Sequence, residues 1–246
     1  MEAHRADADD ERKADLISAY RILVNENILD SFGHVTVRSA KTPDVFLMPR
    51  AMPPSLVTMD DILELRVEDS QPIDPQGRRV NGERYIHGEI FKAREDVSCV
   101  IHTHSQAVIP LSLTKYRMRP VVAQAGFLPP QTPTFEIRDA REPGGRGMQV
   151  TDSRRGAALA KLLGYNPAAL MRGHGNVVVG RSIREAVFRA VYTEINARLA
   201  SEALRLGGGQ VAFLNDEEAN AAAETNSAQI GRPWELWKAK ALRENG

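Results

Sequence analysis

Three histidines stand where their side chains could bind one metal ion. His102 and His104 are two residues apart in HTHS, directly after the apolar run VSCVI, which predicts a buried strand. Because side chains two residues apart in an extended chain lie on the same face, these two imidazoles can converge. His174 lies in RGHG, where the neighbouring glycines let the backbone approach a ligand closely. Each histidine alone is typical of an ordinary polar residue, but three imidazoles with an open fourth position predict a catalytic metal site.

Glu83 is the candidate acid or base beside this site. It begins a predicted helix over residues 83–94, which leads into the strand that carries the histidine pair. The N-terminus of a helix favours the carboxylate form of a glutamate. A helix-capping role explains the local sequence equally well. His87 lies one turn later on the same helical face, and we expect it to support the helix rather than to bind the metal.

Four other residues are candidates for the surroundings of the metal. His34 follows a glycine in SFGHVT, where it can contact a substrate or form part of a turn. Ser31 lies in the same turn, and we expect it to contact the substrate. Arg50 has a planar guanidinium that can bind a carboxylate, although most arginines are simply solvated. Tyr192 stands in mid-helix with apolar residues at helical spacing, for which core packing is the ordinary explanation.

The composition is that of a neutral globular protein. The chain has 246 residues, with 32 Lys plus Arg and 32 Asp plus Glu, so its formal net charge is zero. This balance argues against nucleic-acid binding, and a hydrophobic content of 42% argues against disorder. No segment approaches the ~18 consecutive apolar residues of a membrane span, and the N-terminal segment MEAHRADADDERKAD lacks the basic and then apolar pattern expected of a signal peptide. We therefore expect a cytoplasmic protein without nucleic-acid or membrane partners. Cys99, the only cysteine, excludes an intramolecular disulfide and is typical of a buried thiol.

Hydrophobic periodicity divides the chain into alternating helices and strands. Helices are expected over residues 10–29, 83–94, 106–113, 152–163 and 183–206, with one or two more within 215–242. Strands are expected over residues 34–38, 44–48, 62–66, 97–101, 134–138, 168–171 and 176–180. Several strands follow one another too closely for helical crossovers, which predicts an α/β fold with a mixed or largely antiparallel sheet between helices. We expect one domain over residues 1–246, with 1–10 flexible and 215–246 forming a C-terminal helical extension.

Three segments carry a family resemblance. SFGHVTVR, GERYIHGEIFKAREDVSCVIHTHS and MRGHG, in this order and spacing, resemble the class II aldolase/adducin family over about residues 12–215. The resemblance implies a three-layer α/β/α sandwich with a central, mostly antiparallel sheet, assembled as a homotetramer with its sites at subunit interfaces. It also implies that His102, His104 and His174 bind a divalent metal. Glu83 would then be the acid/base or an additional ligand. The adducin branch lacks the metal ligands, whereas this sequence keeps all three.

The residues that hold a substrate phosphate elsewhere in the family are replaced. Sugar-phosphate members use a Gly-Asn, a Ser-Gly and a Ser-Ser pair. The corresponding pairs in this sequence are Gly33-His34, Arg50-Ala51 and Asn81-Gly82. Exchange of hydroxyl donors for a histidine and an arginine favours a smaller, anionic carboxylated substrate, because arginine binds carboxylate through two charge-assisted hydrogen bonds.

Further segments most resemble a decarboxylase branch of this family. They are FLMPR, ERYIHGEIF, HSQAVIP, FEIRDA and AVFRAVYTEINARL. Members of the branch are described as 3,4-dihydroxyphthalate or 2-hydroxy-3-carboxymuconic semialdehyde decarboxylases. The resemblance therefore implies a carboxy-lyase of aromatic catabolism that acts on a hydroxylated aromatic or ring-cleaved carboxylic acid through a metal-stabilised enolate.

The expected roles follow from this chemistry. Glu83 or His34 supplies the proton that replaces carbon dioxide, and Arg50 orients a carboxylate that stays on the substrate. Tyr192 of a neighbouring subunit is a candidate second acid. Zinc is the expected metal, although imidazoles also suit manganese, cobalt and iron. The alternatives are a metal-dependent aldolase that cleaves a hydroxy-keto acid or sugar-like substrate, and a non-catalytic scaffold of the adducin type, which would bind no stoichiometric metal.

Overall fold

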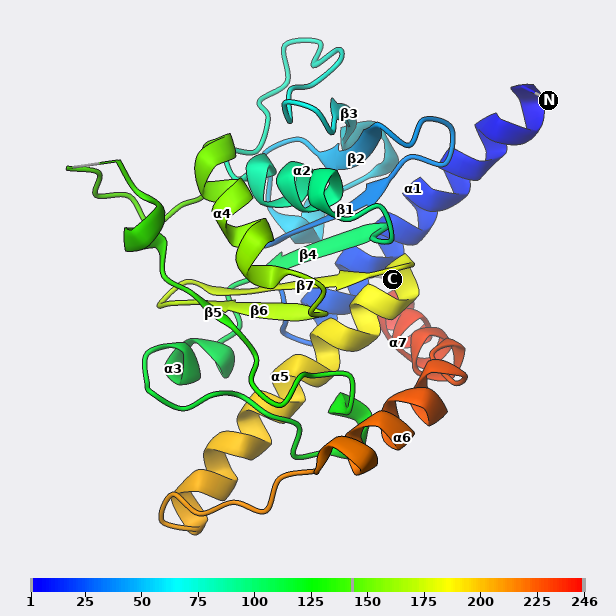
Figure 1. The fold of residues 1–246 in the computed structure, drawn as a ribbon. Coiled ribbons are helices and arrows are strands. Elements are labelled where there is room, and N and C mark those ends of the chain that lie inside the picture. Colours follow the sequence, from blue (N-terminus) through cyan, green and yellow to red (C-terminus); the bar gives the residue numbers. More distant parts are fainter. Residues whose placement is uncertain (1, 143, 245–246) are drawn as a thin grey trace.

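The computed structural model describes residues 2–142 and 144–244, which are built around one seven-stranded sheet (Figure 1). The strands are β1 (His34–Arg38), β2 (Val45–Pro49), β3 (Ile62–Arg66), β4 (Cys99–Thr103), β5 (Thr134–Phe135), β6 (Ala168–Met171) and β7 (Gly175–Gly180). Their order is β3-β2-β1-β4-β7-β6-β5. Neighbouring strands are antiparallel except β5 and β6, which are parallel. The predicted mixed, mostly antiparallel sheet is confirmed.

Helices cover both faces of this sheet (Figure 1). They are α1 (Glu2–Asn25), α2 (Arg84–Ala93), α3 (Val108–Ser112), α4 (Ser153–Leu163), α5 (Ile183–Leu206), α6 (Asp216–Ser227) and α7 (Gly231–Glu244). Val100 and Val177 of the sheet share a core with α2 and α4. Their neighbours Ile101 and Val178 share the other core, with α1, α5 and α7. Because successive strand residues face opposite sides, one buried strand serves two cores, and the predicted three-layer α/β/α architecture is confirmed.

Side-chain caps set where the long helices begin. The Ser182 side chain accepts a hydrogen bond from the backbone N–H of Glu185 at the start of α5. Asp152 caps α4 in the same way by accepting from the backbone N–H of Arg155. Such caps satisfy backbone donors that have no partner within the helix, so both predicted helices begin where the sequence indicates.

Several elements differ from the expected bounds. Helix α1 begins at Glu2 and not at residue 10, and β4 is shifted to Cys99–Thr103, so that His102 lies within the strand. The strand predicted over 134–138 ends at Phe135, because the Glu136 side chain accepts the backbone N–H of Arg138 and starts a 3-10 helix. The predicted C-terminal helical extension also contributes to the core, since Trp234 of α7 is fully buried in the core shared with α1.

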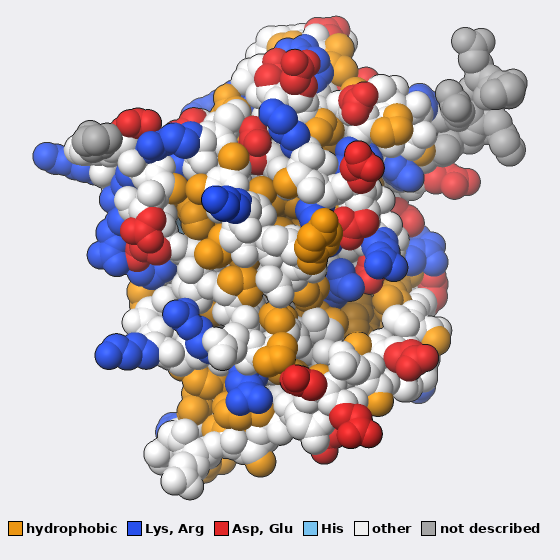
Figure 2. Space-filling model, viewed as in Figure 1, with side chains coloured by type: hydrophobic (Ala, Val, Ile, Leu, Met, Phe, Trp, Pro, Cys, Tyr) orange, Lys and Arg blue, Asp and Glu red, His pale blue; other side chains and the backbone are white. Residues whose placement is uncertain are grey.

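The surface reflects the neutral composition. Figure 2 shows acidic and basic side chains spread over the same face, with hydrophobic side chains between them. Among the described residues, no helix combines the length and apolar character needed to cross a lipid bilayer. Cys99 is fully buried, as its apolar surroundings predicted.

Candidate metal centre

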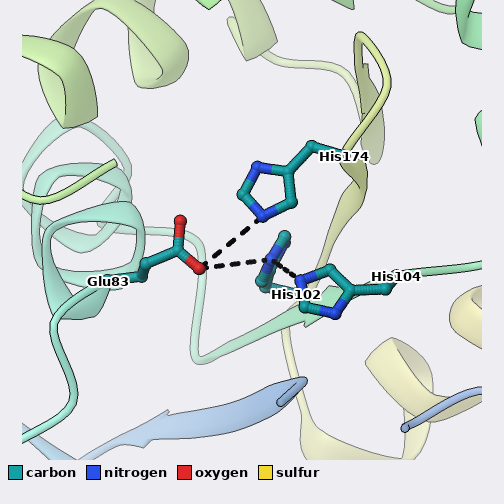
Figure 3. A group of neighbouring side chains, drawn as sticks. All are labelled: Glu83, His102, His104 and His174. Atoms are coloured by element: carbon teal, nitrogen blue, oxygen red, sulfur yellow. Dashed lines mark hydrogen bonds and ion pairs between the residues drawn. The ribbon is translucent and has the colours of Figure 1, made fainter. Parts of the chain in front are cut away.

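Three imidazoles and one carboxylate meet at one end of the sheet. His102 lies in β4, His104 directly follows this strand, His174 lies in the turn between β6 and β7, and Glu83 directly precedes α2. One nitrogen of each imidazole and one carboxylate oxygen of Glu83 lie within 4.8 Å of one another (Figure 3). The structure therefore brings together the four side chains that the sequence singled out as ligands and acid/base.

Glycine places His174 in this group. Gly175 has a φ of +151°, and a Cβ at this position would lie 1.8 Å from the carbonyl oxygen of Thr103. Only a residue without a side chain permits this close approach of β7 to the end of β4. The His174 N–H donates to the carbonyl of Met171 at 3.0 Å, which closes the turn. The tight turn thus brings His174 beside the histidines of β4.

The orientations of His102 and His104 direct their Nε2 atoms toward each other. Nδ1 of His102 lies 3.1 Å from the carbonyl oxygen of Asn176, and Nδ1 of His104 lies 3.0 Å from Oδ2 of Asp30. Both oxygens are acceptors, so each Nδ1 carries a proton, and in the neutral form of either ring Nε2 is then an unprotonated acceptor. These Nε2 atoms lie only 3.3 Å apart. A cation between them removes the conflict between facing lone pairs, and outer acceptors such as those of His102 and His104 are usual in metal sites, although Nδ1 of His174 has no such partner among the described residues.

The protonation states also suit a metal. Burial lowers the pKa of His102 well below its ordinary value and lowers that of His174 as well. Burial acts to raise the pKa of Glu83, but the imidazoles that face it, His34 first, outweigh burial and lower this pKa. Neutral imidazoles and an ionised carboxylate are the forms that bind divalent ions. The residues present therefore fit such an ion.

Each oxygen of Glu83 has a separate environment. Oε1 accepts a hydrogen bond of 2.9 Å from the backbone N–H of Val150. Oε2 lies 3.7 Å from Nε2 of His102 and 3.7 Å from Nε2 of His174 (Figure 3). One oxygen is thus held by the backbone, and the other faces the imidazoles.

A buried hydrogen-bonded chain fixes His34 beside Glu83. Oγ1 of Thr36 donates to the carbonyl of Val100 and therefore accepts from Nδ1 of His87, 2.7 Å away. Nε2 of His87 is then the acceptor for Nδ1 of His34, at 2.6 Å. This leaves Nε2 of His34 facing Oε2 of Glu83 at 3.9 Å, which is beyond hydrogen-bond distance but places the two groups side by side. His87 has the supporting place predicted for it, although it supports His34 and not only its own helix.

A cavity of about 830 Å³ lies in front of these residues. Glu83, His104 and His174 line it, together with the predicted site residues Ser31 and His34. Arg50 is not among the described lining residues, although its neighbour in the chain, Ala51, is one. The cavity therefore has direct access to the candidate metal centre.

Two predicted residues lie elsewhere within this chain. Nε of Arg50 donates to Oδ1 of Asp61 at 2.6 Å, so this guanidinium is already paired. Tyr192 packs on the sheet face opposite to His102, with its ring centroid 4.7 Å from that of Phe188 and 6.1 Å from that of Trp237. A role of Tyr192 in a neighbouring subunit stays a prediction.

The acceptors that orient the imidazoles have no signal in the sequence pattern that would single them out. No role is predicted for Asp30 from the sequence, yet its Oδ1 accepts the backbone N–H groups of Phe32 and Gly33 while its Oδ2 accepts from Nδ1 of His104. An aspartate two residues before an exposed turn is expected to accept backbone N–H groups of that turn. No local sequence pattern predicts the contact with His104. Asn176 contributes through its backbone carbonyl, which carries no side-chain signal.

Comparison with known proteins places this geometry in a family. Residues 14–201 match the family described as Class II Aldolase and Adducin N-terminal domain. The chain belongs to the class II aldolase/adducin family. An aldolase II superfamily protein from Pseudomonas syringae has the same fold, with a TM-score of 0.78 at 22% identity over 95% of this chain and 93% of that one.

Two curated members of the class II aldolase/adducin family are decarboxylases. Decarboxylase tropJ of Talaromyces stipitatus is 32% identical over 240 residues, which cover 90% of each chain. A 3,4-dihydroxyphthalate decarboxylase of Terrabacter sp. is 29% identical over 131 residues, which cover 51% of each chain. Family membership and these relatives together support a lyase.

Proposed function

We propose that this protein is a metal-dependent carboxy-lyase for a hydroxylated aromatic or ring-cleaved carboxylic acid of the dihydroxyphthalate kind. The observation that carries the proposal is the convergence of Glu83 with His102, His104 and His174 beside one cavity, which all of them except the buried His102 line. The decarboxylase relative that is 32% identical over 90% of the chain supports loss of carbon dioxide as the reaction. Aromatic catabolism is the metabolic setting that this substrate class implies.

The three histidines would hold the metal, with Glu83 at its side. A divalent ion supplies Lewis-acid stabilisation for the negative charge that develops on a substrate oxygen during decarboxylation. We propose zinc, because three imidazoles with an open position are a common zinc ligand set. Manganese, cobalt and iron bind imidazole as well, and metal substitution would rank them.

Glu83 and His34 would move the proton. The ionised Glu83 takes the proton of the substrate hydroxyl beside the carboxylate that is lost. Glu83, or His34 beside it, delivers a proton to the substrate carbon that bears the carboxylate. The bond to that carboxylate then breaks, carbon dioxide leaves, and the electron pair of the broken bond returns to the substrate and its oxygen, where a solvent proton restores the hydroxyl. His87 holds His34 with its unprotonated Nε2 toward Glu83 during these steps.

The cavity wall supports a carboxylate rather than a phosphate as the recognised group. Ala51, Asn81 and Gly82, which occupy the positions of the phosphate-binding pairs, all line the cavity and offer no hydroxyl donor. Ser31, also on the wall, is our proposed contact for a substrate hydroxyl. The loss of the other hydroxyl donors argues against a phosphate, and Ser31 leaves one donor for a substrate hydroxyl.

We further propose that the protein works in the cytoplasm as a homotetramer with its sites at subunit interfaces. In such an assembly Tyr192 of one subunit can approach the centre of another. Light scattering coupled to size-exclusion chromatography tests the assembly. If the protein is a monomer with full activity, both the proposed tetramer and the proposed role of Tyr192 are contradicted.

A product assay tests the function. Zinc-loaded protein is incubated with a panel of hydroxylated aromatic acids that includes 3,4-dihydroxyphthalate, and carbon dioxide is measured beside a pyruvate-coupled assay on hydroxy-keto acids. We expect carbon dioxide from at least one aromatic acid and none after chelation. Pyruvate release without carbon dioxide release would instead establish the aldolase alternative, which the fold shared with class II aldolases keeps open.

A further inference from the structure

The cavity wall contains one unpaired cationic side chain. Among the described residues that line the cavity, Arg79 is the only lysine or arginine. Its backbone carbonyl accepts the N–H of Ala51 at 2.7 Å, which anchors this part of the chain beside the cavity. Its guanidinium makes no hydrogen bond or ion pair with any described residue, whereas that of Arg50 is held by Asp61. Arg79 is therefore free to bind an anion that enters the cavity.

The same wall exposes an aromatic ring. Phe32 lines the cavity and is 72% exposed, although its backbone N–H is held by Asp30 at 2.8 Å. Its ring centroid lies 6.4 Å from that of the metal-ligand candidate His104. Folding gains little from a large apolar side chain so exposed, and aromatic rings bind planar partners through offset stacking or edge contacts. Phe32 is therefore suited to pack against a flat substrate next to the metal centre.

We propose that Arg79 and Phe32 select an aromatic carboxylate, with Arg79 binding the carboxylate that the substrate keeps and Phe32 packing against its ring. This inference rests on the proposed function, and it moves the role expected of Arg50 to Arg79. A cavity of about 830 Å³ has ample room for a single substituted ring between these side chains and the metal centre. Neither residue transfers a proton, so both act on binding and positioning.

Binding of an unreactive ligand tests Arg79 without relying on turnover. Phthalate, which lacks the hydroxyl groups needed for reaction, is titrated calorimetrically into the zinc-loaded wild-type protein and the Arg79→Ala, Arg79→Lys and Arg232→Ala variants. A charge-assisted hydrogen-bonded pair contributes roughly 10- to 100-fold in affinity, so we expect Kd to rise by that factor in Arg79→Ala and by less in Arg79→Lys. Arg232, an exposed residue of α7, is the matched control, and we expect no change there.

A second ligand tests Phe32. Cyclohexane-1,2-dicarboxylate presents two carboxylates on a ring that is not aromatic. We expect the wild-type protein to prefer phthalate over this ligand, and the preference to fall about two- to tenfold in Phe32→Leu, which keeps apolar bulk. The preference should persist in Arg79→Ala, where both ligands weaken together. Because both side chains are exposed, the variants should keep the wild-type melting temperature.

Each contrary result has a definite meaning. Unchanged phthalate affinity in Arg79→Ala, or no phthalate binding by the wild type, overturns the assignment of Arg79. If Phe32→Leu prefers phthalate over cyclohexane-1,2-dicarboxylate as strongly as the wild type does, the role assigned to Phe32 is overturned. If inorganic phosphate displaces phthalate and binds with a lower Kd than phthalate does, the site is a phosphate site instead, and the proposal is overturned. If the wild type binds phthalate through Arg79 but releases no carbon dioxide from any substrate, the proposed function fails and the binding site stands.

Discussion

Asp30 and His104 are 74 positions apart in the sequence, yet Oδ2 of Asp30 lies 3.0 Å from Nδ1 of His104. The other oxygen of Asp30 accepts the backbone N–H groups of Phe32 and Gly33. Burial acts to raise the pKa of Asp30, but these hydrogen bonds outweigh it and lower the pKa. A carboxylate fixed by the backbone thus fixes the orientation and tautomer of a metal-ligand candidate.

Asp30→Asn should weaken metal binding. The asparagine oxygen can still accept the backbone N–H groups, but the charge that holds Nδ1 of His104 is lost. Outer partners of this kind contribute about 10- to 100-fold to metal affinity. Competition with a chromophoric chelator measures the change, with Asp69→Asn, a surface residue paired with Arg66, as the control. Equal zinc affinity of Asp30→Asn and wild type would show that the contact does not tune the ligand.

Glu83→Gln should lower the turnover rate without lowering the zinc content. Glutamine can keep the hydrogen bond from Val150 but cannot take up a proton, so we expect zinc to remain and turnover to fall by roughly 10²- to 10⁴-fold. Metal analysis and carbon dioxide release on the same preparation measure both effects. Loss of the zinc from this variant would instead make Glu83 chiefly a ligand.

His87 should matter for rate although it lies outside the metal group. His87→Phe keeps an aromatic ring but removes the acceptor for Nδ1 of His34 and the donor to Thr36, so we expect kcat to fall about tenfold or more with zinc content unchanged. His87→Gln, which can restore a donor and an acceptor, should recover part of the rate. Equal rates in the wild type and a folded Phe variant would refute the role of this buried chain.

Gly175→Ala should destabilise the fold next to the site. The added Cβ would lie 1.8 Å from the Thr103 carbonyl oxygen, and the φ of +151° is unfavourable for alanine. We expect the free energy of unfolding to fall by about 3 kcal/mol. Gly77, with a φ of +74° but open space around it, is the control, and alanine there should cost only about 1 kcal/mol. Urea denaturation measures both, and similar values would show that the close approach is not essential.

Much of the arrangement could be predicted because it depends on local pattern. The spacing of two between His102 and His104 on a β-branched strand already places both imidazoles on one face. The glycines around His174 indicate the tight turn that completes the group. Strand boundaries were less accurate at β5, because the cap formed by Glu136 competes with a strand of good intrinsic propensity.

The choice between two arginines could not be made from the sequence. Arg50 and Arg79 both lie in loops near the positions of the family's phosphate-binding pairs. Which guanidinium is free depends on Asp61, whose carboxylate binds Arg50 and leaves Arg79 as the cation on the cavity wall. The partner of His104 was hidden for a similar reason, since side-chain contacts between distant loops leave no periodic signal.

The amount of zinc bound by the wild type and by His174→Ala, measured on identical preparations by elemental analysis after dialysis, tests the central claim that three imidazoles hold a metal in this cavity. We predict about one equivalent per wild-type chain and a large loss in His174→Ala, because removal of one of three imidazoles opens the site. Equal metal content in the two proteins, or none in either after zinc loading, would contradict the account.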